Sequence, residues 1–166
     1  MDYTAPYPSP LGTMTMASDG THLIGLWFDG QKYFGSTLSA DPEERPDLPI
    51  FGMTRKWLNV YFGGDLPSSV PPIHLRLGAF RRLVCERLLA IPYGETTTYG
   101  EMGRIIAIQR GGASLSAQAI GGAVGHNPIS LIIPCHRVVA ANGSLCGYAG
   151  GLERKAFLLD MEKRER

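Results

Sequence analysis

The segment Pro134-Cys135-His136-Arg137-Val138 places a nucleophile and a base next to each other in the chain. A cysteine beside a histidine can have a lowered thiol pKa, and the thiolate is the form of cysteine that attacks carbon. The apolar run at residues 129–133 predicts a buried strand leading into this segment. An inert core cysteine is the alternative, because free cysteines are commonly buried. These residues alone leave both alternatives open.

Residues 117–124, just before this segment, predict a short helix that is almost bare of side chains. Ser114 or Ser116 can cap it, and the glycines inside it each cost about 1 kcal/mol relative to alanine. Something must therefore approach the helix backbone closely. Either another helix packs tightly against it, or it enters a DNA groove that is too narrow for large side chains.

Two more helices are predicted upstream of this bare helix. Apolar residues at helical spacing between positions 80 and 91 predict the first, and they include Cys85, which we interpret as structural. Thr98-Tyr99-Gly100-Glu101 has the form of a capping box and predicts a second helix that ends before Arg110-Gly111-Gly112. A glycine-containing turn then joins it to the bare helix, which suggests a helix-turn-helix.

The first part of the chain has a different pattern. Residues 11–17 and 21–28 predict a β-hairpin, and residues 51–62 predict a short helix. The proline-rich loop at 66–72 predicts a boundary. We therefore expect an N-terminal α/β subdomain at residues 1–70 and a C-terminal domain at residues 71–166 that carries the chemistry.

Charge and cysteine content restrict the class of protein. The 166 residues have a net charge of +1, but residues 1–70 hold 4 Lys or Arg against 8 Asp or Glu, and residues 71–166 hold 12 against 7. The second part is therefore the candidate binder of an anion such as DNA. The three cysteines form no CxxC pair, which favours reduced thiols. With no apolar run long enough for a membrane helix and no secretion signal, a cytoplasmic protein is expected.

Several motifs together resemble one protein family. Residues 117–123 (Ala-Gln-Ala-Ile-Gly-Gly-Ala), Asn127-Pro128 and residues 134–138 look like the signature of the O6-alkylguanine-DNA alkyltransferases, also called methylated-DNA protein-cysteine methyltransferases. The similarity continues at residues 91–95, 147–152 and 158–162, and more faintly at 9–12 and 25–28. The resemblance implies an α+β fold with a ribonuclease-H-like, strand-rich N-terminal subdomain and a helical C-terminal domain with a helix-turn-helix.

The resemblance also implies the chemistry. Cys135 would be both the nucleophile and the permanent acceptor of an alkyl group from O6-alkylguanine in DNA, so the protein acts once. Glu162 would orient His136, which deprotonates Cys135 through a water. Asn127 would brace the turn before the active-site segment, and Tyr99 would help to swing the nucleotide out of the stack and assist the leaving guanine.

The remaining implied roles concern binding. The family pattern implies DNA contacts from the bare helix and the turn before it, and a substrate pocket near the cysteine; the DNA-binding residues would be Ser116, Gln118, Ala119, Gly121 and Arg110, and the pocket residues Tyr148 and Val138. The expected partner is double-stranded DNA containing O6-alkylguanine, bound by a monomer without metal or cofactor. The preference between guanine and O4-alkylthymine lesions stays open.

Gln118 departs from the family pattern, in which most members have an arginine that fills the space of the extruded base. Glutamine lacks the charge and planar fork of arginine. Arg110, in a longer turn than usual, is our hypothesis for a phosphate contact that partly replaces the missing charge.

Three other functions fit the sequence less well than alkyl transfer. A lesion-binding module that only signals damage lacks the acceptor cysteine, whereas this chain has it. A thiol hydrolase is disfavoured if residues 135 and 136 are extended, because neighbouring side chains of a strand point to opposite faces. A transcriptional helix-turn-helix protein needs long side chains on its recognition helix, which residues 117–124 do not provide.

Overall fold

The structure is a computed structural model that describes residues 1–164. By their internal contacts these residues form two compact units. Unit 1 consists of Met1–Arg76 and Pro128–Ser130, and unit 2 consists of Leu77–Asn127 and the described residues from Leu131 onward. The expected subdomains at 1–70 and 71–166, as units of function, stay a prediction. No helix among the described residues has the length and apolar character needed to cross a membrane.

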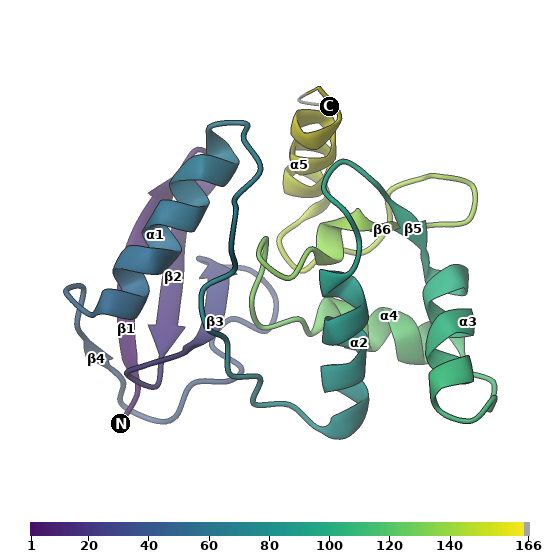
Figure 1. Cartoon of the computed structure of the whole chain (residues 1–166), viewed down its shortest axis with the longest axis horizontal. Coiled ribbons are helices and arrows are strands. Elements are labelled where there is room, and N and C mark those ends of the chain that lie inside the picture. The colour runs from purple at the N-terminus through teal and green to yellow at the C-terminus, as the bar shows by residue number, and fades with distance from the viewer. Residues whose placement is uncertain (165–166) are drawn as a thin grey trace. The chain divides into compact units, whose positions relative to one another are not determined.

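Unit 1 is built on a four-stranded sheet in the order β3-β2-β1-β4 (Figure 1). Its strands are β1 (Tyr3–Ser9), β2 (Gly12–Ser18), β3 (Leu23–Phe28) and β4 (Glu43–Glu44). The predicted hairpin is confirmed as the antiparallel pair β2–β3. Strand β1, also antiparallel to β2, was not predicted, because Pro6 and Pro8 mask its strand pattern. They are tolerated since β4 pairs only with Tyr3 and Thr4, which leaves the rest of β1 at an edge.

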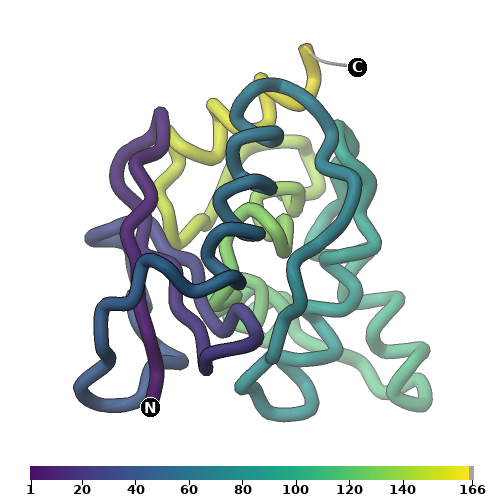
Figure 2. Tube along the Cα trace, turned by 60° about the vertical axis from the view of Figure 1, so that its left-hand side comes forward, coloured from purple at the N-terminus to yellow at the C-terminus, as the bar shows by residue number. Residues whose placement is uncertain are grey.

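Helix α1 (Pro49–Phe62) covers this sheet, as both the ribbon and the Cα trace show (Figures 1 and 2). The predicted helix at 51–62 is therefore confirmed and begins two residues earlier, with Pro49 in the first turn, where no amide donor is needed. Phe51, Leu58 and Tyr61 on its inner face are fully buried, as is every residue of β3. The core of unit 1 lies between this helix and the sheet.

Strand β3 also makes two isolated parallel bridges at its outer edge. One joins Leu23 to Ile73, and the other joins Leu26 to Ile129. The predicted strand at residues 129–133 is wrong beyond this bridge. Leu131 has a left-handed backbone with φ of 71°, so the chain turns away directly after Ser130 donates its amide to Leu26.

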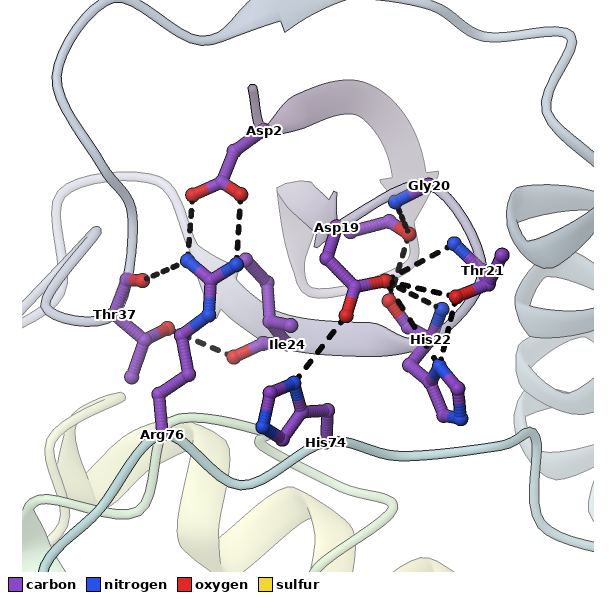
Figure 3. Close-up of polar contacts among 10 residues, drawn as sticks. Asp2, Asp19, Gly20, Thr21, His22, Ile24, Thr37, His74 and Arg76 are labelled. Carbon is purple, nitrogen blue, oxygen red and sulfur yellow. Dashed lines mark hydrogen bonds and ion pairs between the residues drawn. The ribbon is translucent and has the colours of Figure 1, made fainter.

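Polar side chains tie the ends of unit 1 together (Figure 3). The Arg76 guanidinium donates from Nη1 and Nη2 to the two carboxylate oxygens of Asp2 at 2.7 and 2.9 Å. Asp19 accepts from the backbone amide of His22 at 2.8 Å and lies 3.3 Å from Nδ1 of His74. These contacts join β1 and the turn between β2 and β3 to the segment at residues 74–76. No group of three His, Cys, Asp or Glu residues within 1–164 could hold a metal ion.

Unit 2 is mainly helical (Figure 1). It contains α2 (Ala79–Leu89), α3 (Tyr99–Gln109), α4 (Ala117–Gly125), the 3-10 helix η1 (Cys135–Arg137) and α5 (Leu152–Arg164), with a short parallel pair of β5 (Thr97–Thr98) and β6 (Val138–Val139). Helix α4 contacts both α2 and α3. The β5–β6 pair places the start of α3 beside the end of η1.

Local signals in unit 2 set where the predicted helices begin and end. The Thr98 side chain accepts from the Glu101 amide, as expected for a capping box, and the Ser116 side chain accepts from the Ala119 amide. The second half of the capping box is wrong, because the Glu101 carboxylate bonds to Arg104 and not to the helix start. The turn between α3 and α4 uses Gly111 and Gly112 at φ of 94° and 91°, a conformation that favours glycine.

Candidate active site around Cys135

Cys135 lies in a buried helical turn. Its amide donates to Ile133 O at 2.8 Å, and the Arg137 amide donates to Pro134 O at 3.0 Å. All three residues of η1 are buried. The extended segment expected here is therefore wrong, and the argument that strand geometry separates the side chains of Cys135 and His136 does not apply.

The Glu162 carboxylate contacts the two residues that follow Cys135 in the chain and one distant backbone amide. Its carboxylate lies 2.6 Å from His136 Nε2 and accepts from Arg137 Nε at 2.8 Å. It also accepts from the Gly94 amide at 3.1 Å. His136 and Glu162 are 0 % and 1 % exposed, so water does not screen the interaction of their side chains. The structure thus brings together Cys135, His136 and Glu162, which are up to 27 positions apart in the chain.

The electrostatics of this cluster favour a neutral histidine. Burial alone would raise the pKa of Glu162, but hydrogen bonds and charge from His136 and Arg137 outweigh it and hold the pKa well below its usual range. Burial lowers the pKa of His136, against the opposing effect of Glu162. An ionised Glu162 accepts a proton-bearing Nε2, which leaves Nδ1 of the neutral ring as the basic nitrogen. His136 can therefore take up a proton through Nδ1.

The environment of Cys135 corrects one expectation. Burial raises the pKa of the thiol, although a hydrogen bond from Asn127 and the positive charge of Lys155 act in the opposite direction. The lowered thiol pKa expected from the neighbouring histidine is thus wrong for the resting protein. Because the resting group is a thiol, a base is needed when it reacts.

Asn127 joins the end of α4 to the active-site turn. Its Nδ2 donates to Ile133 O at 2.7 Å, and the residue is buried. This contact spans six residues and includes the sharp turn at Leu131. Asn127 is therefore in a position to hold the backbone that carries Cys135.

Lys155 is a candidate functional residue that sequence reasoning missed. It is fully buried on α5, and its Nζ donates to Val138 O at 2.6 Å, Cys146 O at 3.0 Å and Gly147 O at 3.1 Å. Three acceptors match the three donors of an ammonium group, so the charge is supported despite burial. Its spacing from the buried Leu158 and Glu162 places it on the inner face of the helix, which was the available signal.

Tyr99 begins α3 and shares acceptors with Lys155. Its hydroxyl donates to Cys146 O at 3.0 Å, and Lys155 Nζ lies 5.8 Å from the centre of its ring. Burial, together with the charges of Cys146 and Cys135, raises the pKa of Tyr99 to about 12. The hydroxyl is therefore protonated at neutral pH and can act as a proton donor.

Of the two expected pocket residues, Val138 directly follows η1 and Tyr148 lies in the loop between β6 and α5. The Tyr148 ring meets the His136 ring edge to face, with 6.5 Å between the centroids. Val138 in β6 is fully buried.

The other two cysteines differ: Cys146 is exposed, whereas Cys85 is buried in α2, where burial and the charges of Cys135 and Glu86 raise its pKa to about 12. These values favour the structural interpretation of Cys85.

The bare helix α4 presents an open face. A Cβ atom built at Gly121, Gly122 or Gly125 would meet no described atom within 4 Å apart from the neighbouring residues and backbone of its own helix. Tight packing against another helix, one of the two explanations for these glycines, is therefore wrong; the close approach of α3 to α4 is at Gly103, where a Cβ would lie 3.4 Å from Ile120.

The expected DNA-binding residues lie on or near this open face. Gln118 and Ala119 are exposed, and Ser116 uses its hydroxyl in the cap. Arg110 is also exposed, with its guanidinium 5.1 Å from the centre of the Phe80 ring. Arg137, by contrast, is buried against Glu162 and Ile91 O, which indicates a structural role for it.

Two family models match the chain. Residues 3–75 match the ribonuclease-like domain of 6-O-methylguanine DNA methyltransferase, and residues 79–164 match its DNA-binding domain. A curated methylated-DNA–protein-cysteine methyltransferase from Mycobacterium tuberculosis is 43% identical over 155 residues, covering 93% of this chain and 88% of that protein. The Haemophilus influenzae protein of the same name is 37% identical over 164 residues, covering 97% of this chain and 86% of that protein.

Solved structures give the same result. The crystal structure of the Mycobacterium tuberculosis O6-methylguanine methyltransferase superimposes with a TM-score of 0.84 at 40% identity, covering 100% of this chain and 95% of that one. The Mycobacterium tuberculosis protein in complex with DNA superimposes with a TM-score of 0.82 at 38% identity, covering 99% and 93%. With both domains matched in order, the chain belongs to the methylated-DNA–protein-cysteine methyltransferase family.

Proposed function

We propose that this protein repairs DNA by moving the alkyl group of O6-alkylguanine onto the sulfur of Cys135, once per molecule. The observation that carries the proposal is the buried arrangement of Cys135, His136 and Glu162 in a chain of this family. Burial keeps Cys135 a thiol, and the neutral, oriented His136 is the base that such a thiol needs in order to react.

The reaction is a displacement at the alkyl carbon. The thiol proton passes through a water to Nδ1 of His136, and a sulfur lone pair forms the new carbon–sulfur bond. The carbon–O6 bond breaks, and its electron pair stays on the guanine. Tyr99 supplies a proton to the leaving guanine and regains one from His136, so the products are unmodified guanine and S-alkylated Cys135. A thioether has no good leaving group, which explains why the protein acts once.

Helix α4 is the part of the protein that we assign to the DNA minor groove. Its open face at Gly121 and Gly122 allows a DNA backbone to approach more closely than side chains would permit. Gln118 is exposed near the start of the helix and occupies the space of the extruded base. Ser116 and Ala119 lie beside it, and Arg110 reaches a phosphate from the preceding turn.

The first test is the mass of the intact protein after incubation with excess duplex DNA containing O6-methylguanine. We expect a gain of one methyl group, located on the peptide that contains Cys135, and no gain in Cys135→Ser. The Cys85→Ser and Cys146→Ser variants are the matched controls and should still gain the methyl group. Binding of the lesion without a gain of mass would instead identify a lesion sensor and refute alkyl transfer.

A further inference from the structure

The Tyr148 hydroxyl is a buried hydrogen-bonding group that the described residues leave unsatisfied. The backbone of Tyr148 belongs to the partly exposed loop before α5, but its Oη is buried and has no hydrogen-bond partner within residues 1–164. A buried hydroxyl without a partner destabilises a protein, and such groups are retained where a bound molecule completes them. The structure thus has an unused donor at this position.

The position of this donor identifies what it faces. The Tyr148 ring contacts the His136 ring, so it lies on the Cys135 side of unit 2. The ionisable groups around the hydroxyl are Cys135, Arg154 and Glu162. Burial, with the charge of Cys135, raises the pKa of Tyr148 well above its usual range, so the hydroxyl is protonated at neutral pH. It is therefore a hydrogen-bond donor close enough to Cys135 for the charge of that group to act on it.

In the proposed reaction, the groups next to the sulfur surround the alkyl chain, because the sulfur must lie close to the first carbon of that chain. A methyl group is too short to offer a second polar atom. A chain of two carbons that carries an oxygen on the second carbon can supply the acceptor that Tyr148 lacks. A propyl group fills the same space but leaves the hydroxyl unsatisfied.

We propose that Tyr148 determines alkyl-group specificity by donating a hydrogen bond to an oxygen on the transferred chain. The preferred substrates are then O6-(2-hydroxyethyl)guanine and similar oxygen-bearing adducts, in preference to O6-propylguanine. This inference rests on the proposed function, since it concerns the group that Cys135 receives.

The test compares the rates at which Cys135 is alkylated by duplexes that carry O6-methyl-, O6-(2-hydroxyethyl)- or O6-propylguanine. Reactions of the full chain and of its Tyr148→Phe variant are stopped at set times, and the alkylated peptide is quantified by mass spectrometry. Tyr148→Phe keeps the ring against His136 and removes only the hydroxyl. Because the alkyl groups differ in intrinsic reactivity, the decisive quantity is the change in the hydroxyethyl-to-propyl rate ratio between the two proteins.

We expect this ratio to fall about 10-fold in Tyr148→Phe, which is the loss of one buried hydrogen bond to the transition state. Tyr93→Phe is the matched control, because its ring lies against the Arg137 guanidinium, 5.6 Å from the ring centre, and the ratio should not change. An unchanged ratio in Tyr148→Phe, whether or not all three rates fall together, would refute the specificity role. Absence of methyl transfer by the native chain would refute the proposed function instead.

Discussion

Each unit of this protein contains an arginine–carboxylate pair, partly exposed at its arginine in unit 1 and buried in unit 2, and the two pairs serve different purposes. In unit 1, Arg76 binds both carboxylate oxygens of Asp2. In unit 2, Arg137 binds both carboxylate oxygens of Glu162. The geometry is similar, but the Glu162 carboxylate also contacts the buried His136, next to Cys135. Asp2 has further contacts too, but they come from Ser39. The comparison teaches that the contact to a buried histidine, rather than the ion pair, separates a structural pair from a candidate catalytic one.

The largest difference between the two pairs should appear when each carboxylate is neutralised. Glu162→Gln removes the charge that orients His136, so we expect the rate of Cys135 alkylation to fall by about 10²- to 10⁴-fold. Asp2→Asn is the matched control and should leave that rate unchanged while lowering the free energy of unfolding by about 1–3 kcal/mol. The rates are measured by rapid quench, and stability by urea unfolding.

The pH dependence of the rate distinguishes orientation of His136 from a loss of folding in Glu162→Gln. The native rate should be nearly constant around neutral pH, because His136 removes the thiol proton. In the variant the rate should rise with pH, because burial raises the thiol pKa and hydroxide must then form the thiolate. A variant that is slow by a constant factor at every pH would assign Glu162 to structure alone and make the two pairs equivalent.

Acid should destabilise unit 2 before unit 1. The pKa of His136 is lowered by burial, so protonation of the unfolded chain removes stability once the pH falls below about 6.5. In unit 1, burial opposes but does not outweigh the hydrogen bonds that lower the pKa of Asp19 from 3.8 to about 2. Its stabilising effect is present above pH 4 and is lost only as the pH falls toward 2.

Native-state hydrogen exchange between pH 7 and pH 4 checks this order. We expect amides of α5 and η1 to lose protection near pH 6, while those of β2 and β3 keep theirs until a lower pH. Simultaneous loss of protection in both units would show that His136 does not control the acid response.

A matched pair of glycines extends the comparison to the helices. Gly52 in α1 and Gly121 in α4 both have open space where a Cβ would lie. Alanine at either position should stabilise the protein by about 0.5–1 kcal/mol. Only Gly121→Ala should weaken binding to lesion-containing duplex, by about 10-fold or 1.4 kcal/mol, because the added methyl group meets the DNA backbone. Equal DNA affinity in the two variants would remove α4 from the interface.

The smallest expected effect concerns two arginines that lie over aromatic rings. Arg110 lies over Phe80 in unit 2, and Arg45 lies over Tyr3 in unit 1. If Arg110 contacts a phosphate, Arg110→Ala should reduce the slope of log affinity against log salt by about 1. Arg45→Ala should leave it unchanged. The hypothesis that Arg110 replaces part of the charge missing at Gln118 fails if both slopes equal that of the native protein.

Short-range signals in the sequence determined much of the local structure of this protein. The caps at Thr98 and Ser116, the glycine turn between α3 and α4 and the β2–β3 hairpin each depend on neighbouring residues, so they could be predicted from the chain. The motifs around Cys135 also indicated the family, because a reaction that needs adjacent residues leaves a contiguous pattern.

Only the tertiary structure decided the electrostatics and the exposed faces. The pKa of Cys135 depends on burial and on Lys155, which is 20 positions away, and no local pattern reports either of them. A turn at Leu131 takes the place of the predicted strand, because the backbone hydrogen bonds to β3 end at Ser130. Likewise, the glycines of α4 could have met either another helix or open space. The sequence could not decide between them, because the neighbours of α4 come from distant parts of the chain.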